Sequence, residues 1–220
     1  MKKPKIFIAC DTTNLSKVKK IIKQSQSAKI KIGYKFGLEF MNSKNGRQFV
    51  SKLRNKIIFI DLKLNDTVNT MLSAVKALKD LKINYLTVHI SSGLSALKAV
   101  KKVSGFTKIV GVTTLTSLNN NDLKSIGYSK SVKNLVLHQA KLAKKADLDA
   151  LVCSPYEVSA VRKVFKKEII TPGVQIGRRN YDQKRSMEAK NVKSDWLVIG
   201  RAITRGNIKK NILKLAKDLK

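Results

Sequence analysis

Short apolar runs alternate with longer amphipathic stretches along the chain, and this alternation restricts the possible folds more than any other feature of the sequence. The apolar runs, each as long as one β-strand, cover residues 6–10, 30–34, 57–60, 85–90, 109–113, 150–153, 169–171 and 196–199. Helical periodicity is clearest over residues 15–24, 68–81 and 132–146. About eight alternating strand and helix units favour a (β/α)8 TIM barrel formed by one domain, residues 1–220, and leave an open doubly wound sheet as the alternative.

The chain is strongly basic, with 46 Lys and Arg residues against 14 Asp and Glu residues and a formal net charge of +32. In isolation, such a charge suggests binding to nucleic acid or to an anionic membrane surface. The lysines are nevertheless scattered through every segment, and they form no long basic block or patch interleaved with aromatic residues. We therefore expect a lysine-coated surface without a specific nucleic-acid site. A basic nucleic-acid-binding protein stays as an alternative.

The two cysteines, Cys10 and Cys153, lie in apolar runs about 140 residues apart, which is poor evidence for a disulfide framework. The N-terminus enters a strand-like segment without the apolar region of a signal peptide. No apolar run approaches the roughly 18 residues of a membrane span. The sequence thus predicts a cytoplasmic protein that does not bind a membrane.

Charged residues follow the apolar run at residues 57–60 directly. Charges delivered at the end of a buried strand are costly unless they neutralise one another or a ligand. In a barrel, the active site collects residues from the carboxyl ends of the strands. The polar and glycine residues at or near these ends are Asp11, Lys31, Asp61, Lys63, Asp66, His89, Thr116, Ser117, Ser154, Gly173, Gly200 and Arg201. The acids that follow apolar runs carry the most information, because loops are polar in most proteins.

Each of these candidates also has a less specific interpretation. The three charges after residues 57–60 could form an exposed ion pair in a loop, which is common and nearly neutral in energy. Lys31 lies between Lys29 and Lys35 in a lysine-rich segment, so any of the three could face solvent. Asp11 could belong to the N-cap region of the first helix, together with the polar residues that follow it. His89 is typical of a core or supporting residue.

An ordered set of motifs resembles the orotidine 5′-phosphate decarboxylase family. The central motif is Asp61-x-Lys63-x-x-Asp66-x-x-Asn69-Thr70. Matching segments in the same order and at similar spacing are Asp11 and residues 30–33, 88–89, 115–117, 152–155, 171–173, 182–185 and 199–204. The similarity covers nearly the whole chain.

The resemblance implies a carboxy-lyase that converts orotidine 5′-phosphate to UMP and CO2 in de novo pyrimidine biosynthesis, without a cofactor or metal. In the family pattern, Lys31, Asp61, Lys63 and Asp66 of the partner subunit form a chain of alternating charges. Lys63 would stabilise the carbanion at C6 and then protonate it. The active unit would be a homodimer with shared sites, to which Asp66 and Thr70 come from the neighbouring subunit.

The remaining substrate contacts follow from the same resemblance. Asp11 would bind the ribose hydroxyls, and Thr116 and Ser117 would bind the substrate after the fifth strand. The phosphate would lie against the backbone N–H groups and guanidinium at Gly200 and Arg201, with Gln183 as a further donor.

The chain departs from the family in the segment expected to close over the phosphate. Gln175 stands where bacterial members carry a phosphate-binding arginine. We expect Arg178 or Arg179, from the lid at residues 174–181, to replace that charge, and the sequence leaves open which of the two does so.

A second enzymatic interpretation stays open. The related hexulose-phosphate synthase and keto-gulonate-phosphate decarboxylase group consists of Mg²⁺-dependent sugar-phosphate lyases, which usually carry a glycine shortly after the second acid. Residues 67–70 and 115–117 of this chain favour the pyrimidine substrate. Dependence on a metal ion would distinguish the two activities.

Overall fold

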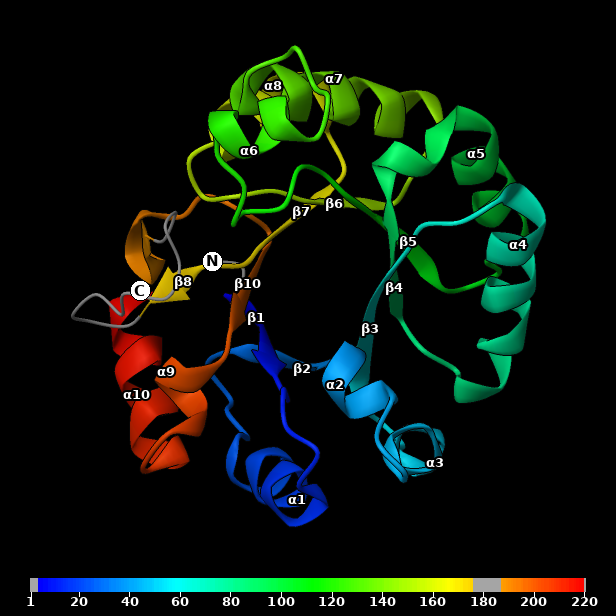
Figure 1. Cartoon of the computed structure of the whole chain (residues 1–220). Helices are drawn as coiled ribbons and strands as arrows, with labels where there is room; N and C mark the ends of the chain where they lie inside the picture. Colours follow the sequence, from blue (N-terminus) through cyan, green and yellow to red (C-terminus); the bar gives the residue numbers. More distant parts are fainter. Residues whose placement is uncertain (1–3, 176–186, 220) are drawn as a thin grey trace.

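Parallel strands form a closed barrel in this protein. The structure, a computed structural model, describes residues 4–175 and 187–219. Within these ranges, eight strands pair in the order β1-β10-β7-β6-β5-β4-β3-β2, and β1 closes the ring by pairing with both β10 and β2 (Figure 1). The barrel strands are β1 (Lys5–Ala9), β2 (Lys31–Gly37), β3 (Ile57–Leu64), β4 (Tyr85–His89), β5 (Lys108–Val112), β6 (Ala150–Val152), β7 (Glu168–Thr171) and β10 (Trp196–Ile199). The predicted barrel is confirmed, and the open sheet is wrong.

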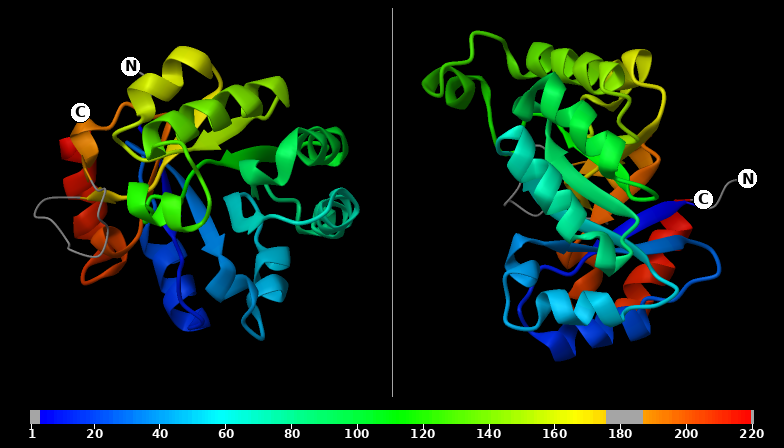
Figure 2. Two further views of the ribbon diagram at one scale, coloured as in Figure 1. Left: turned by 45° about the horizontal axis from the view of Figure 1, so that its top comes forward. Right: turned by 90° about the vertical axis from the view of Figure 1, so that its right-hand side faces the viewer.

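Helices surround the barrel on its outside (Figures 1 and 2). The helices and 3-10 turns are α1 (Leu15–Gln24), α2 (Leu38–Met41), α3 (Gly46–Lys52), α4 (Val68–Ala77), η1 (Lys79–Leu81), η2 (Ile90–Ser92), α5 (Gly93–Val103), α6 (Asn120–Ser125), α7 (Val132–Lys145), α8 (Val158–Val164), η3 (Ala189–Asn191), α9 (Arg201–Thr204) and α10 (Ile208–Asp218). Their apolar faces pack on the strands in the main core cluster. In the part of the chain described, no helix is long and apolar enough to cross a bilayer.

The helical periodicity located three of these helices closely. The predicted helix at residues 15–24 coincides with α1, which buries Val18 and Ile21 against the barrel. The stretch at 68–81 is divided into α4 and η1, and the stretch at 132–146 corresponds to α7. Beside the barrel, β8 (Val174–Gln175) pairs with β9 (Met187–Glu188). The segment around α6 projects from the body of the molecule in the right-hand view of Figure 2.

The inside of the barrel is aromatic toward the amino ends of the strands. The Phe7 ring stacks on Trp196 with 4.1 Å between ring centroids, and it lies 4.9 Å from Phe59 and 5.2 Å from Tyr85. All four side chains are buried. The rings fill the interior, so this end of the barrel is a packed core and not a pore.

Charged side chains replace the aromatic ones two residues further along the strands. In β3, Asp61 lies two residues after the aromatic Phe59. In β2, Lys35 lies two residues after Gly33, the glycine against which the Phe7 ring packs. Because successive side chains of a strand point to opposite faces, residues two apart face the same interior. The strands are parallel and share their carboxyl end, so these charges meet at one mouth of the barrel.

Glu168, the first residue of β7, lies at the opposite, amino end of the barrel. Its carboxylate accepts hydrogen bonds from Tyr85 Oη at 2.9 Å, Lys108 Nζ at 2.8 Å and Trp196 Nε1 at 3.3 Å. The partly buried Glu168 carboxylate and the polar groups of the aromatic side chains at that end therefore have hydrogen-bond partners.

Gly33 allows the aromatic layer to pack against β2. A Cβ atom on this residue would lie 2.6 Å from Cε1 of Phe7, which is too close for a carbon contact. We expect Gly33→Ala to lower the free energy of unfolding by about 1–3 kcal/mol, because the ring has to shift within a filled interior. Chemical denaturation measures this change, and an unaltered denaturation midpoint would contradict the packing described.

Candidate active site

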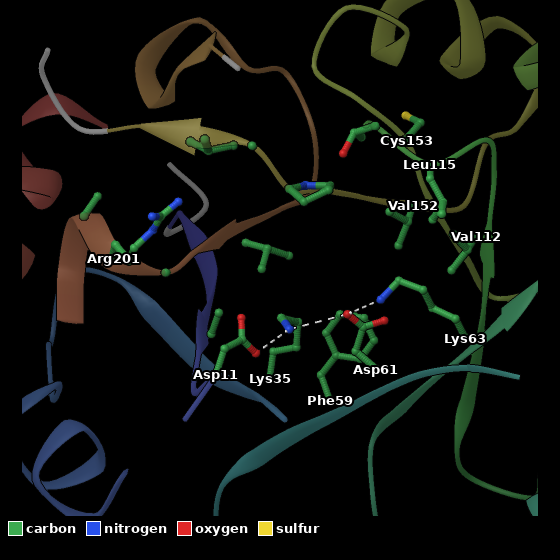
Figure 3. A pocket seen from close by; sticks show the side chains of 18 of the residues that line it. Asp11, Lys35, Phe59, Asp61, Lys63, Val112, Leu115, Val152, Cys153 and Arg201 are labelled. Carbon is green, nitrogen blue, oxygen red and sulfur yellow. Dashed lines mark hydrogen bonds and ion pairs between the residues drawn. The ribbon is translucent and has the colours of Figure 1, made fainter. Parts of the chain in front are cut away.

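Four charged side chains alternate in sign across the carboxyl ends of β1, β2 and β3. Lys35 Nζ lies 3.0 Å from Asp11 Oδ1 and 3.4 Å from Asp61 Oδ2. Lys63 Nζ lies 2.9 Å from the same Oδ2 atom of Asp61. Figure 3 shows the resulting line of contacts from Asp11 through Lys35 and Asp61 to Lys63. We call these four residues the charge array.

The middle of the charge array is buried and its ends are open. The side chains of Lys35 and Asp61 are 10% and 14% exposed, against 33% for Lys63 and 52% for Asp11. Burial alone would raise the pKa of the Asp61 carboxyl, but Lys35, Lys63 and the hydrogen bonds from Lys63 and Thr87 lower that pKa below its ordinary value. Burial alone would lower the pKa of Lys35, but Asp61 and Asp11 raise it. Both groups are therefore charged at neutral pH.

The prediction that Lys31 belongs to the charge array is wrong in its geometry. Lys31 is the exposed first residue of β2 and pairs with Lys5, at the amino end of the barrel. The predicted strand ended at residue 34, whereas β2 continues to Gly37. Lys31 and Lys35 lie on the same face of β2. Lys35 is further along the strand, toward its carboxyl end, and it occupies the place that the prediction assigned to Lys31.

A cavity of about 450 Å³ lies above the charge array, a size typical of pockets for small molecules. Asp11, Lys35, Asp61 and Lys63 line it. Its other lining residues include the apolar Val112, Leu115, Val152, Cys153, Pro172 and Val198, and the polar or glycine residues Thr114, Thr116, Gly173, Gln175, Gly200, Arg201 and Thr204. An apolar wall for a ring and polar groups at two ends suit a ligand with a flat base and hydrophilic substituents.

The predicted phosphate end is partly assembled. Gly200 and Arg201 follow β10 and line the cavity, with Arg201 on the side away from Lys63 in Figure 3. Gln175, in β8, also lines it. The predictions for Gln183, Arg178 and Arg179 lie outside the described residues.

Asp11 lines the cavity and does not cap the first helix. The N-cap of α1 is Asn14, whose side chain accepts a hydrogen bond from the Lys17 backbone N at 2.9 Å. Asp11 is therefore available to a ligand on its exposed side while it contacts Lys35.

The residues predicted after the fifth strand are separated. Thr116 lines the cavity, whereas Ser117 is exposed and does not belong to the lining. Gln139 of α7 supports this segment from below, because its buried Oε1 atom accepts hydrogen bonds from the Thr114 backbone N at 2.7 Å and from the Thr114 hydroxyl at 3.1 Å.

Asp66 and Thr70 lie on the exposed surface beside the mouth and do not line the cavity of their own chain. Asp66 Oδ1 accepts a hydrogen bond from the Thr67 backbone N at 2.7 Å, and the Thr67 and Thr70 hydroxyls are 3.0 Å apart. Both side chains are therefore exposed to solvent at the edge of the mouth.

His89, at the end of β4, is half-buried. Burial, and then the nearby charge of Lys63, lower the pKa of its imidazole below the ordinary value, against an opposing effect of Asp61. The ring is therefore neutral at neutral pH, which agrees with a supporting position rather than a charged one.

Two residues of the site were missed from the sequence, Lys35 and Thr87. Thr87 is fully buried and contacts both Asp61 and the Lys63 backbone. A signal for both was present: strict alternation from the inward Phe59 and Tyr85 leads along neighbouring strands to Asp61 and Thr87, and from Gly33 to Lys35. Lys35 was obscured because the apolar run at residues 30–34 ends before β2 does, and Thr87 was obscured because it lies inside the apolar run at residues 85–90 like any core residue.

Within the described ranges, no group of three or more His, Cys, Asp or Glu side chains is arranged to hold a metal ion. Both cysteines are buried thiols that form no disulfide, and burial raises the pKa of the Cys10 thiol to about 12.

A parallel (β/α)8 barrel with ionisable side chains and a cavity at the carboxyl ends of its strands is the architecture of a barrel enzyme. The family model described as "Orotidine 5'-phosphate decarboxylase / HUMPS family" matches residues 4–214. The chain belongs to this family.

Individual relatives agree over nearly the whole length. The chain is 40% identical over 222 residues to an orotidine 5′-phosphate decarboxylase of Wolbachia sp. subsp. Brugia malayi (strain TRS), covering 96% of each chain. It is 42% identical over 209 residues to the protein of that name from Wolbachia pipientis subsp. Culex pipiens (strain wPip), covering 90% of this chain and 91% of the relative. A crystal structure of orotidine 5′-phosphate decarboxylase from Lactobacillus acidophilus is similar with a TM-score of 0.83 and 27% identity, over 99% of both chains.

The assignment of Lys35 to the charge array is tested by comparing Lys35→Met with Lys31→Met. Removing Lys35 leaves the buried Asp61 carboxylate with one ammonium fewer, so we expect a loss of about 3–5 kcal/mol in the free energy of unfolding at neutral pH. The exposed Lys31 should change it by less than about 0.5 kcal/mol.

The same comparison has a defined pH dependence. The lowered pKa of Asp61 contributes stability above its ordinary value of 3.8, and that stability is lost as the pH falls through the lower folded-state value. Without Lys35 this contribution is diminished, so the difference between the Lys35→Met protein and the unaltered protein should persist down to about pH 4 and shrink only as the pH is lowered below 3.8. Equal losses in the free energy of unfolding for Lys35→Met and Lys31→Met at neutral pH would contradict the assignment of Lys35, rather than Lys31, to the charge array.

Proposed function

We propose that the protein decarboxylates orotidine 5′-phosphate to UMP and CO2, a step of de novo pyrimidine biosynthesis. The observation that carries this proposal is the Asp61–Lys63 ion pair, 2.9 Å long, at the wall of a cavity in a chain of this family. Two relatives at 40% and 42% identity bear the name of this activity. They support it over the Mg²⁺-dependent sugar-phosphate lyase and over a basic nucleic-acid-binding protein.

The reaction needs electrostatic stabilisation of a localised charge. The bond between C6 and the carboxylate breaks, CO2 leaves, and the electron pair stays on C6 in the plane of the pyrimidine ring, where it cannot delocalise into the π system. A fixed ammonium beside C6 stabilises that charge in the transition state. Lys63 then transfers a proton from Nζ to C6, which gives UMP, and takes up a new proton from water.

Asp61 and Lys35 prepare Lys63 for this step. The Asp61 carboxylate holds the ammonium at 2.9 Å and favours its charged form. Lys35, 3.4 Å from Asp61, keeps that acid ionised at its buried position. Asp61 would also lie against the departing carboxylate, where repulsion between like charges destabilises the bound substrate.

The rest of the cavity fits the other parts of a nucleotide. Asp11, which is half exposed, binds the ribose hydroxyls, and Thr116 binds the pyrimidine. Gly200 and Arg201 bind the phosphate together with Gln183. Since Gln175 carries no charge, Arg178 or Arg179 supplies the second cation for the phosphate dianion. Ser117 contributes only if the segment after β5 rearranges around the ligand.

The active unit in this proposal is a cytoplasmic homodimer. Lys63 lines the cavity and keeps 33% of its side chain exposed, which leaves room for a second carboxylate. Asp66 of the partner subunit fills that place and extends the charge array, and Thr70 of the partner subunit contacts the substrate. The exposed position of both residues beside the mouth supports this arrangement.

Turnover of orotidine 5′-phosphate, followed by ultraviolet absorbance, tests the activity. We expect the purified protein to consume the substrate equally well with and without a chelator. Lys63→Ala should reduce kcat at least about a hundredfold, because it removes the group that stabilises the anion. Lys98→Ala, which removes an exposed lysine of α5, should leave kcat unchanged. Loss of activity with the chelator would favour the sugar-phosphate lyase, and no turnover at all would refute the proposal.

Mixing two inactive variants tests the sharing of sites between subunits. When Lys63→Ala and Asp66→Asn chains exchange, half of the dimers are hybrids, and one of the two sites in each hybrid carries neither substitution. We expect activity to rise to about a quarter of the unaltered level after random pairing.

The matched control mixes Lys63→Ala with Asp61→Asn. Both of these residues serve a site from the same chain, so each hybrid site carries one substitution and the mixture stays inactive. Equal behaviour of the two mixtures would show that Asp66 acts within its own chain or not at all.

A further inference from the structure

β3 departs from regular pairing at the point where it delivers its charged side chains. Ile60 pairs with Leu86 of β4, and the next pair is Leu64 with Val88. Four steps along β3 therefore correspond to two steps along β4. Within this irregularity Lys63 has a φ of +50°, in the left-handed region that is costly for a residue with a Cβ atom. Such strain persists only where surrounding contacts hold the backbone in place.

Thr87 lies opposite the irregular part of β3, and its hydroxyl provides such contacts. The Oγ1 atom accepts a hydrogen bond from the Lys63 backbone N at 2.8 Å and donates one to Asp61 Oδ1 at 3.0 Å. Thr87 is 0% exposed, so water does not substitute for either bond. One hydroxyl thus contacts the backbone of the lysine and the side chain of the acid that form the central ion pair.

The two oxygen atoms of Asp61 have different partners. Lys35 and Lys63 both contact Oδ2, whereas Oδ1 accepts the hydrogen bond from Thr87. Contacts to one oxygen leave a carboxylate able to rotate about its Cβ–Cγ bond, and a contact to the second oxygen fixes that rotation. The direction in which Oδ2 points, and with it the position of Lys63 Nζ, therefore depends on the Thr87 hydroxyl.

We propose that Thr87 is a positioning residue for the decarboxylation, which holds Asp61 and Lys63 in the orientation in which the ammonium faces C6 of the substrate. This inference rests on the proposed function, because it assigns Thr87 a part in that reaction. Thr87 does not line the cavity and acts through the two residues that do. Misplacement of a reacting group by about 1 Å can lower the rate a hundredfold. The loss of one buried hydroxyl that positions Lys63 is therefore expected to lower kcat.

Two substitutions separate the hydroxyl from the shape of the side chain. Thr87→Val removes the hydroxyl with little change of volume, and Thr87→Ser retains it. Thr113→Val is the matched control, because Thr113 is a buried threonine beside the end of β5 whose hydroxyl donates to the Val152 carbonyl oxygen at 2.8 Å and contacts no member of the charge array. Each variant is measured for kcat and KM with orotidine 5′-phosphate and for the exchange rate of the Lys63 amide hydrogen.

We expect Thr87→Val to lower kcat roughly 10- to 100-fold with KM changed less than about threefold, since the binding groups stay in place. Thr87→Ser should recover most of kcat, and Thr113→Val should keep it within about twofold. The Lys63 amide should exchange at least about tenfold faster in Thr87→Val and stay protected in Thr87→Ser. A kcat of Thr87→Val equal to that of Thr113→Val would overturn the proposal.

The amide measurement distinguishes this inference from the proposed function. If the unaltered protein does not turn over orotidine 5′-phosphate, the proposed function fails, and so does the catalytic part assigned to Thr87. Faster exchange of the Lys63 amide in Thr87→Val would then still establish that the hydroxyl holds β3. An unchanged exchange rate of the Lys63 amide in Thr87→Val would show that the Thr87 hydroxyl does not hold the backbone of β3.

Discussion

The Asp61 carboxylate, held between the ammonium groups of Lys35 and Lys63, is the interaction on which the site depends. Burial to 14% exposure by itself raises the pKa of the Asp61 carboxyl, because burial disfavours the charged form. Two cations within 3.4 Å reverse that preference, and the acid in turn keeps Lys35 charged although it is more buried still. Each charge is thus retained by its neighbours, which makes the array a single electrostatic unit.

The barrel supplies the rigidity that such a unit requires. Its interior is filled by stacked aromatic rings toward the amino ends, and the charge array lies directly above them on the same strands. The charged side chains therefore lie on a closely packed layer of buried rings. A site preorganised in this way stabilises a developing anion without first having to reorient, which is the main source of electrostatic catalysis.

Much of the fold and part of the site could be predicted from the sequence. Eight apolar runs gave the strands, because burial requires apolar side chains whatever the function, and the abrupt change from Ile60 to Asp61 marked the active mouth. Lys35 was missed because the apolar run ended at residue 34, before the strand itself, and Lys31 matched the same alternation at the wrong end. Thr87 was missed because a buried threonine in a strand resembles any core residue: alternation from Tyr85 places it toward the interior, but its hydrogen bonds to Asp61 and to the Lys63 backbone are seen in the structure alone. The parts assigned to Asp66 and Thr70 depend on a second subunit, which the pattern of a single chain does not describe.

The claim that the charge array stabilises an anion at C6 is tested most directly by ligand binding without turnover. The measurement is the ratio of the dissociation constants of UMP and of a UMP analogue with a negatively charged oxygen at C6, for the unaltered protein and for Lys63→Ala. The account predicts that the analogue binds at least about a hundredfold more tightly than UMP, and that Lys63→Ala removes most of this preference while UMP binding changes little. Equal affinities for the two nucleotides, or a preference that survives Lys63→Ala, would contradict it.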